Sequence, residues 1–198
     1  LGVRILYGVL NEQEDIWCER VYAPWIDMEE KMRENGVKLY GLESGDAISN
    51  FDMVSFSLAY ELCYTNMLNM MDLGGIPLRS ADRTDEHPIV IAGGPCAYNP
   101  EPLAPFFDIF SIGEGEEALP ELTEKLRDAR ARNLSREEFL FEVSQMEGFY
   151  VPSLYDATYN EDGTLATFTP NREGVPAVVR KRIIKELDKV YYPQDQII

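Results

Sequence analysis

The sequence has no long hydrophobic run, only one histidine and no paired cysteines. No apolar run approaches the roughly 18 residues that a membrane span needs, and no signal peptide precedes the first predicted element, so we expect a cytoplasmic protein with no membrane partner. The single histidine, His87, does not allow a Ser/His/Asp or Cys/His catalytic set to be assigned. Three cysteines lie far apart and form neither a disulfide framework nor a metal-ligand spacing. We therefore predict no catalytic residue and no metal ligand.

The sequence also has far fewer basic residues (18) than acidic ones (35). The 198 residues carry a formal net charge of -17, which argues against nucleic acid as the main partner, because phosphate binding needs clustered Lys and Arg. Residues 171–198 differ, since they hold six basic and four acidic residues. A mildly basic tail on an acidic body is suited to docking onto another part of its own polypeptide, although a solvated basic strand explains the same composition.

Three short apolar runs organise the sequence, and each opens into a loop of small or polar residues. They are residues 52–58, 88–92 and 107–112. Near-continuous apolar runs bounded by glycine predict strands buried on both faces, as in a parallel sheet covered by helices. Helical spacing in residues 60–73 and 116–131 agrees. The sequence thus predicts an α/β fold in which the loops beyond the strands form the candidate site.

The first predicted element is an amphipathic helix at residues 1–11. A doubly wound sheet normally starts with a strand, so its absence suggests an excerpt from a longer protein. Further along, residues 16–22 and 37–42 are predicted as strands. Between them lies a helix at residues 27–35 that ends at Gly36.

The pattern changes near residue 148. Before it, Ser135 is predicted to cap a helix that runs to about Met146. After it, alternating residues 154–159 and 165–169 flank Asp162-Gly163, a strong hairpin signal, and residues 175–185 are a candidate third strand. We predict an α/β domain at residues 1–148 and an antiparallel β-ribbon with a linker at residues 149–198.

Glycines follow two of the predicted strands, in Gly93-Gly94-Pro95 and Gly113-Glu114-Gly115. Such loops let a ligand approach the backbone, and the following helix start favours anionic groups. Tight turns from strand to helix need glycine in any case. Neither a P-loop nor a G-x-G-x-x-G fingerprint occurs. The nearby Glu116 and Glu117 are better explained as favourable charges at a helix start than as paired catalytic acids.

As an ordered set, the loop motifs are specific, although none is specific alone. The main motifs are Asp52-x-Val54-x-Phe56-Ser57-Leu58, Ile91-Ala92-Gly93-Gly94-Pro95 and Ile112-Gly113-Glu114-Gly115-Glu116. Further motifs are Tyr60-Glu61, Tyr64-Thr65-Asn66, Leu68-Asn69-Met70, Gly75-Ile76-Pro77-Leu78-Arg79 and Pro95-Cys96-x-x-Asn99-Pro100-Glu101-Pro102. The main set resembles the cobalamin-binding-type domain at the front of many radical S-adenosylmethionine (SAM) proteins, the further motifs resemble one branch of them, and the likeness covers essentially the whole chain.

The resemblance implies a flavodoxin-like (Rossmann-like) domain, here without its first strand, ahead of a partial TIM barrel. In that barrel a C-x-x-x-C-x-x-C motif holds a [4Fe-4S] cluster that cleaves SAM to a radical. This chain lacks the motif. We therefore expect a non-catalytic accessory domain whose partner is its own downstream radical SAM domain.

The resemblance also implies cobalamin as a cofactor. The Asp-x-His-x-x-Gly loop that supplies an axial histidine in such domains is absent, and His87 stands in the wrong place to replace it. By position, the residues that would line a cobalamin site are Ser57, Leu58, Tyr60, Glu61, Gly93, Gly94, Pro95, Gly113, Glu114 and Gly115.

Two hypotheses from other classes stay open. One is a protein-interaction or scaffold module whose loops are vestigial. The other is a small flavodoxin-like enzyme that binds a flavin or nucleotide, with Trp17, Trp25 and Tyr60 as stacking surfaces. No phosphate-binding loop supports the second.

Overall fold

A four-stranded sheet forms the centre of the computed structural model, which describes residues 2–192. The strand order is β1-β2-β3-β4, with β1 to β3 parallel and β4 antiparallel to β3. The strands are β1 (Met53–Ser57), β2 (Ile89–Gly93), β3 (Ile109–Ser111) and β4 (Phe149–Tyr150). The predicted α/β class with a mostly parallel sheet is confirmed.

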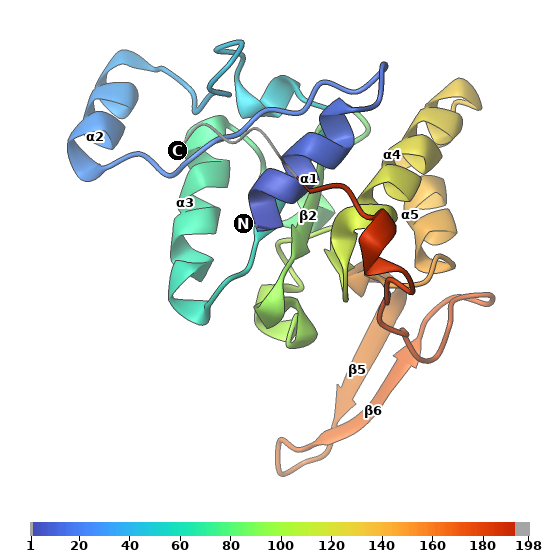
Figure 1. Cartoon of the computed structure of the whole chain (residues 1–198). Coiled ribbons are helices and arrows are strands. Elements are labelled where there is room, and N and C mark those ends of the chain that lie inside the picture. The colour runs from blue at the N-terminus through green and yellow to red at the C-terminus, as the bar shows by residue number, and fades with distance from the viewer. Residues whose placement is uncertain (1, 193–198) are drawn as a thin grey trace.

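Helices cover both faces of this sheet. Figure 1 shows α3 on one side of β2 and α4 with α5 on the other, and α1 packs against α4. The α-helices are α1 (Gly2–Asn11), α2 (Ile26–Asn35), α3 (Tyr64–Gly74), α4 (Gly115–Ala131) and α5 (Arg136–Ser144). Short 3-10 helices lie at Ile48–Asn50, Glu61–Cys63, Ser80–Asp82, Pro95–Tyr98, Glu101–Leu103, Pro152–Leu154 and Leu187–Lys189.

The core explains why the three apolar runs became strands. Along β2 the four residues 89–92 are buried, and neighbouring β3 is buried throughout. A chain of aromatic rings crosses the sheet, with centroids 5.7 Å apart between Phe56 and Phe107 and 5.4 Å apart between Phe107 and Phe110. The predicted burial on both faces is confirmed for β2 and β3. It is wrong for β1, where Val54 and Phe56 are buried but Ser55 and Ser57 are exposed.

Local signals placed the helix ends correctly. Helix α2 ends where Gly36 takes a left-handed conformation, as predicted. The Ser135 side chain accepts a hydrogen bond from the backbone of Glu138, whose carboxylate accepts one in return from the Ser135 backbone. This capping box satisfies amides that the first helical turn leaves unpaired. None of the helices within residues 2–192 combines the length and apolarity that a membrane crossing requires.

Two predicted strands, residues 16–22 and 37–42, do not form. The first has no regular secondary structure, and the second contributes one isolated bridge, from Tyr40 to Ala47. Alternation shows that a segment suits a pleated surface, but a strand also needs a neighbour with free backbone groups. Within the described residues neither segment pairs with β1, so the prediction is wrong for both.

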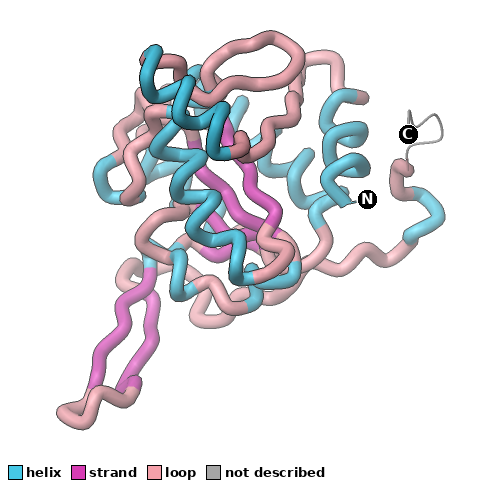
Figure 2. Tube along the Cα trace, turned by 90° about the vertical axis from the view of Figure 1, so that its left-hand side faces the viewer, coloured by secondary structure: helices cyan, strands magenta, loops and turns pink. Residues whose placement is uncertain are grey.

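The hairpin is confirmed, whereas a third strand is not. Strands β5 (Tyr155–Tyr159) and β6 (Leu165–Pro170) pair antiparallel around the Asp162-Gly163 turn. They project away from the sheet, as Figure 2 shows. Residues 175–185 are irregular apart from one bridge between Arg182 and Gly113, so the predicted strand there is wrong.

The main sheet extends past residue 148, because β4 pairs with β3. The division of the chain at that residue stays a prediction. Residue 1 and the linker at residues 193–198 lie outside the described residues.

Candidate functional site

The first two strands bring their following loops together at the carboxyl edge of the sheet. Ser57 pairs with Gly93 in the β1–β2 register. Beyond that pair, the Leu58 amide donates to the Gly93 carbonyl at 2.7 Å, and the Cys96 amide donates to the Leu58 carbonyl at 3.1 Å. The register therefore brings these two loops together at one edge of the sheet, as predicted.

Close packing accounts for Gly94. Its φ of 100° is rarely adopted by residues with a side chain, and an added Cβ would lie 3.1 Å from the Leu58 carbonyl oxygen. Leu58 itself is completely buried. Two of the predicted cofactor contacts, Leu58 and Gly94, therefore pack against each other.

The third loop is covered by the chain itself. Residues 180–185, which we call the strap, run across Ile112 and Gly113 at this edge. The Arg182 amide donates to the Ile112 carbonyl at 2.8 Å, and the Glu114 amide donates to the Arg182 carbonyl at 3.2 Å. The Glu114 carboxylate accepts a hydrogen bond from the Ile184 amide. An added Cβ on Gly113 would overlap the Arg182 carbonyl oxygen.

Ion pairs fix the strap to α4. The Arg182 guanidinium donates to Glu117 at 3.0 Å and to Glu121 at 2.5 Å, and its side chain is largely buried. Hydrogen bonding to Glu121, opposed by burial and supported by Glu117, raises the pKa of Arg182. Glu117 thus serves as a partner for the strap at the helix start.

Further along, the chain returns to α1. The Tyr191 ring lies where a side chain on Gly8 would stand. A small cavity of about 290 Å³ separates this stretch from the start of α4. It is lined by Val9, Glu116, Glu117, Lys185, Glu186, Lys189, Val190 and Tyr191.

Three side chains on the first two loops remain exposed. Tyr60, Leu62 and Tyr98, which we call the aromatic rim, are 55%, 85% and 58% exposed. Neighbouring Cys63 donates from Sγ to the Tyr60 carbonyl at 2.7 Å, and burial raises the pKa of the Cys96 thiol. Large apolar and aromatic side chains exposed on neighbouring loops are a candidate interaction surface.

His87 lies at the opposite, amino edge of the sheet, ahead of β2. Its Nδ1 accepts from the Thr84 amide at 3.0 Å, and its carbonyl accepts from the Arg136 guanidinium at 3.0 Å. The side chain therefore does not belong to the carboxyl-edge loops. The cofactor-binding role of all ten predicted contacts, Ser57, Glu61, Gly93, Pro95 and Gly115 included, stays a prediction. Gly115 packs next to the Leu6 side chain of α1.

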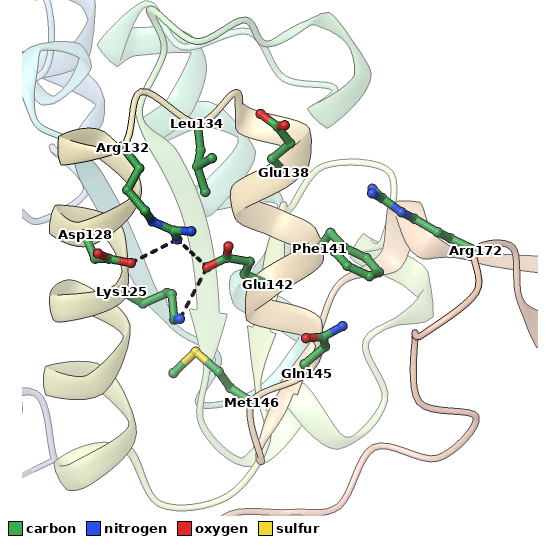
Figure 3. Close-up of a pocket in the computed structure, with 10 residues that line it drawn as sticks. All are labelled: Lys125, Asp128, Arg132, Leu134, Glu138, Phe141, Glu142, Gln145, Met146 and Arg172. Atoms are coloured by element: carbon green, nitrogen blue, oxygen red, sulfur yellow. Dashed lines mark hydrogen bonds and ion pairs between the residues drawn. The ribbon is translucent and has the colours of Figure 1, made fainter.

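Sequence reasoning missed a groove of about 790 Å³ between α4 and α5, shown in Figure 3. Arg132 donates to Glu142 at 2.6 Å and pairs with Asp128 at 2.9 Å, while Lys125 reaches Glu142 at 3.3 Å. Hydrogen bonding to Arg132 lowers the pKa of Glu142. These charges satisfy one another, and only the packing of two helices brings them together, so no sequence motif signals the groove.

One further wall of the groove comes from the segment after the hairpin. The Arg172 guanidinium lies 3.8 Å from the centre of the Phe141 ring.

Across residues 2–192, no three His, Cys, Asp or Glu side chains gather in an arrangement that could hold a metal ion.

Comparison with known proteins identifies a family. The model of the N-terminal region of radical SAM proteins matches residues 2–152, which excludes the β5–β6 hairpin. The uncharacterized protein MJ0966 of Methanocaldococcus jannaschii is 37% identical over 87 residues, a match that covers 43% of this chain and 18% of that protein. No solved structure matches. Because the family model spans most of the described fold, from α1 to β4, the chain belongs to the family of radical SAM protein N-terminal domains.

Proposed function

We propose that this chain is an accessory domain that positions a cofactor or substrate for a downstream domain carrying a [4Fe-4S] cluster and SAM. Family membership supports the accessory role. The observation that carries the proposal is the aromatic rim, which lies at the edge where open α/β sheets present their ligand-binding loops. This surface is the contact that we assign to the downstream domain.

The course of the strap supports docking within one polypeptide. The strap brings the chain to the carboxyl edge at Gly113, and Tyr191 still lies against α1. A domain that follows is therefore tethered near the rim. Tethering raises the effective concentration of a partner, so a modest rim suffices for docking.

Cobalamin is the specific cofactor that the resemblance suggests. Two observations count against its fit. The Gly113 and Glu114 positions are engaged by the strap, and the sole histidine lies at the opposite edge. The residues present do not match a site with an axial histidine, so we propose no chemical step that involves cobalamin.

A binding experiment tests the docking. This chain and the remaining part of the same polypeptide are purified separately, and their affinity is measured by titration calorimetry. We expect Leu62→Glu to weaken binding by about tenfold or more, since it places a charge in the centre of the contact. Val178→Glu is the matched control, because Val178 is 74% exposed outside the rim. Equal affinities of both variants would contradict the proposal.

A spectroscopic titration tests the cofactor. We expect hydroxocobalamin to show no change in its visible spectrum with this chain. A spectral change that Gly93→Val abolishes would instead establish a cobalamin site on the β2 loop. Anaerobic treatment with iron and sulfide should leave no stable cluster absorption.

A scaffold module with vestigial loops is the second candidate. The occupation of the Gly113 loop by Arg182 favours it, because a glycine retained for packing needs no cofactor. Turnover by the whole protein separates the two candidates. Slower turnover by the whole protein with Leu62→Glu than with Val178→Glu supports positioning, whereas equal turnover by the two variants supports a scaffold.

A further inference from the structure

The β5–β6 hairpin has one polar face and one apolar face. In its register Thr158 lies opposite Thr167, and their hydroxyl groups form a hydrogen bond of 2.6 Å on the polar face. Because side chains alternate along a strand, the pairs on either side of this one point to the other face. That face carries Tyr155, Ala157 and Tyr159 of β5 with Leu165, Phe168 and Pro170 of β6.

The apolar face is buried only at the base of the hairpin, next to the main sheet. There the Tyr155 and Phe168 rings stack with centroids 5.5 Å apart, and Tyr155 also packs on Tyr150 of β4. Further out, Tyr159 and Leu165 are 66% and 57% exposed. Figure 1 shows the hairpin extending away from the helices, so no described part of the chain covers this region. A two-stranded sheet with an open apolar face is marginally stable in water unless a partner packs on it.

Contacts at the base hold the hairpin in one orientation. The Asn171 amide donates to the Leu154 carbonyl at 3.0 Å, and the Asn171 side chain donates to Asp156 at 3.2 Å. The next residue, Arg172, lies over the Phe141 ring of α5. A surface that is ordered before binding loses less conformational entropy when a partner arrives. The hairpin therefore presents its apolar face as a preformed contact.

The hairpin and the segment that follows it carry opposite charges. Residues 155–170 include three acidic residues and no basic one, and the acidic residues are Asp156, Glu161 and Asp162. Residues 172–189, which we call the basic segment, include six basic residues and three acidic ones. Arg180, Lys181 and Lys185 of this segment are exposed, and none of them forms an ion pair within the described residues. The two regions are therefore complementary in charge.

A single molecule keeps these opposite charges apart. The turn that contains Glu161 lies at the far end of the hairpin from the main sheet, as Figure 2 shows. The basic segment stays at the base, where the Tyr155 hydroxyl donates to the Pro176 carbonyl at 2.7 Å. Because Tyr155 belongs to the apolar face, the basic segment passes the base on that side. A second hairpin laid antiparallel along the apolar face brings its turn to the basic segment.

We propose that two copies of this chain form a dimer by packing the apolar faces of their β5–β6 hairpins together in antiparallel orientation. Tyr159, Leu165 and Phe168 form the apolar centre, and Glu161 of each copy meets Lys181 of the other at the rim. Each contact is made twice, so two copies satisfy each other and the assembly closes. This inference does not rest on the proposed function, and the hairpin lies outside the family match.

The net charge of -17 on each copy does not prevent this dimer. At physiological ionic strength, exposed charges more than about 8 Å apart are largely screened from each other. The charges next to the contact therefore decide the electrostatic contribution, and these are opposite in sign.

Sedimentation equilibrium tests the dimer with a matched pair of variants. We expect a monomer–dimer equilibrium that depends on the concentration of this chain. Leu165→Glu places a charge in the apolar centre and should weaken the dimer by about tenfold or more. Thr167→Glu adds the same charge to the polar face and should change the dissociation constant by less than about threefold. Circular dichroism checks that both variants keep the fold.

Three results of this experiment would overturn the proposal. They are a monomer at every concentration up to about 0.5 mM, equal dissociation constants for the two variants, and growth beyond two copies, which indicates a head-to-tail contact.

An exchange of charges tests the antiparallel orientation. Glu161→Lys and Lys181→Glu should each weaken the dimer by about threefold to tenfold, since each brings like charges together at two equivalent contacts. Both substitutions in one chain should return the dissociation constant to within about twofold of the original value. Additive losses in the double variant, or no loss in either single variant, would show that the hairpins do not pack in this way.

Discussion

Arg182 and Gly113 lie backbone to backbone at the carboxyl edge of the sheet, joined in an isolated parallel bridge. Gly113 has a φ of 109°, and an added Cβ would overlap the Arg182 carbonyl oxygen. A glycine after a buried strand is thus explained here by a strap of the same chain. A ligand-binding loop would also use glycine here, but the group that approaches Gly113 is the Arg182 backbone and not a ligand.

Gly113→Ala should release the strap. The new Cβ combines a backbone conformation that costs about 1–3 kcal/mol with a steric overlap against Arg182. We expect a lower melting temperature and faster trypsin cleavage after Arg182, measured by calorimetry and by mass spectrometry of the fragments.

Gly45→Ala is the matched control for this change. Gly45 also has a positive φ, 78°, but no atom lies within 4 Å of the added Cβ. It should lose stability without exposing Arg182 to trypsin. Equal cleavage after Arg182 in both variants would show that the strap does not depend on Gly113.

Asp108 should be the most sensitive carboxylate in the fold. Its Oδ2 accepts from Arg83 at 2.9 Å, from Arg136 at 2.6 Å and from the Val90 amide at 2.7 Å, and the side chains of Asp108 and Arg83 are fully buried. Asp108→Asn leaves buried guanidinium charge uncompensated, so we expect a loss of about 3–5 kcal/mol in urea unfolding.

Asp72→Asn provides the comparison for Asp108. Asp72 pairs with Arg33 at 2.9 Å, but both side chains are about half exposed. Exposed pairs contribute about 0–1 kcal/mol, so the unfolding midpoint should hardly move. Similar losses in the two variants would mean that the Asp108 cluster does not contribute through buried charge.

Acid should disturb the segment around Glu19. Burial disfavours the Glu19 carboxylate, but hydrogen bonds from the Trp17 indole at 2.6 Å and the Ser44 amide outweigh it and lower the pKa to about 2. Because this value lies below the ordinary 4.5, the ionised form stabilises the fold above about pH 4.5, and that contribution is lost as the pH falls toward 2.

Trp17 fluorescence measures this transition, in a Trp25→Phe background that removes the other tryptophan. We expect an emission change between about pH 4.5 and 2 that Glu19→Gln eliminates. An unchanged acid transition in Glu19→Gln would assign it to another group.

Much of the fold followed from local pattern. Strands β2 and β3 were predictable because their residues are buried on both faces, as in a covered parallel sheet. Strand β1 was predictable from its position and apolar residues, although its Ser55 and Ser57 side chains are exposed. The Ser135 cap and the Asp162-Gly163 turn were predictable because their backbone requirements are met within a few residues. Residues 16–22 and 37–42 failed as strands because pairing depends on a neighbour that alternation does not reveal.

For the candidate site, the sequence by itself determined that glycine-bearing loops follow the parallel strands and that no cluster-binding cysteine motif is present. Only the tertiary structure decided which loops stay accessible. It buried Leu58 against Gly94, placed Arg182 over Gly113 and left Tyr60 exposed. The reason is that the strap and the Gly113 loop are about 70 residues apart in sequence, and such long-range contacts are set by packing of the whole chain and not by local propensity.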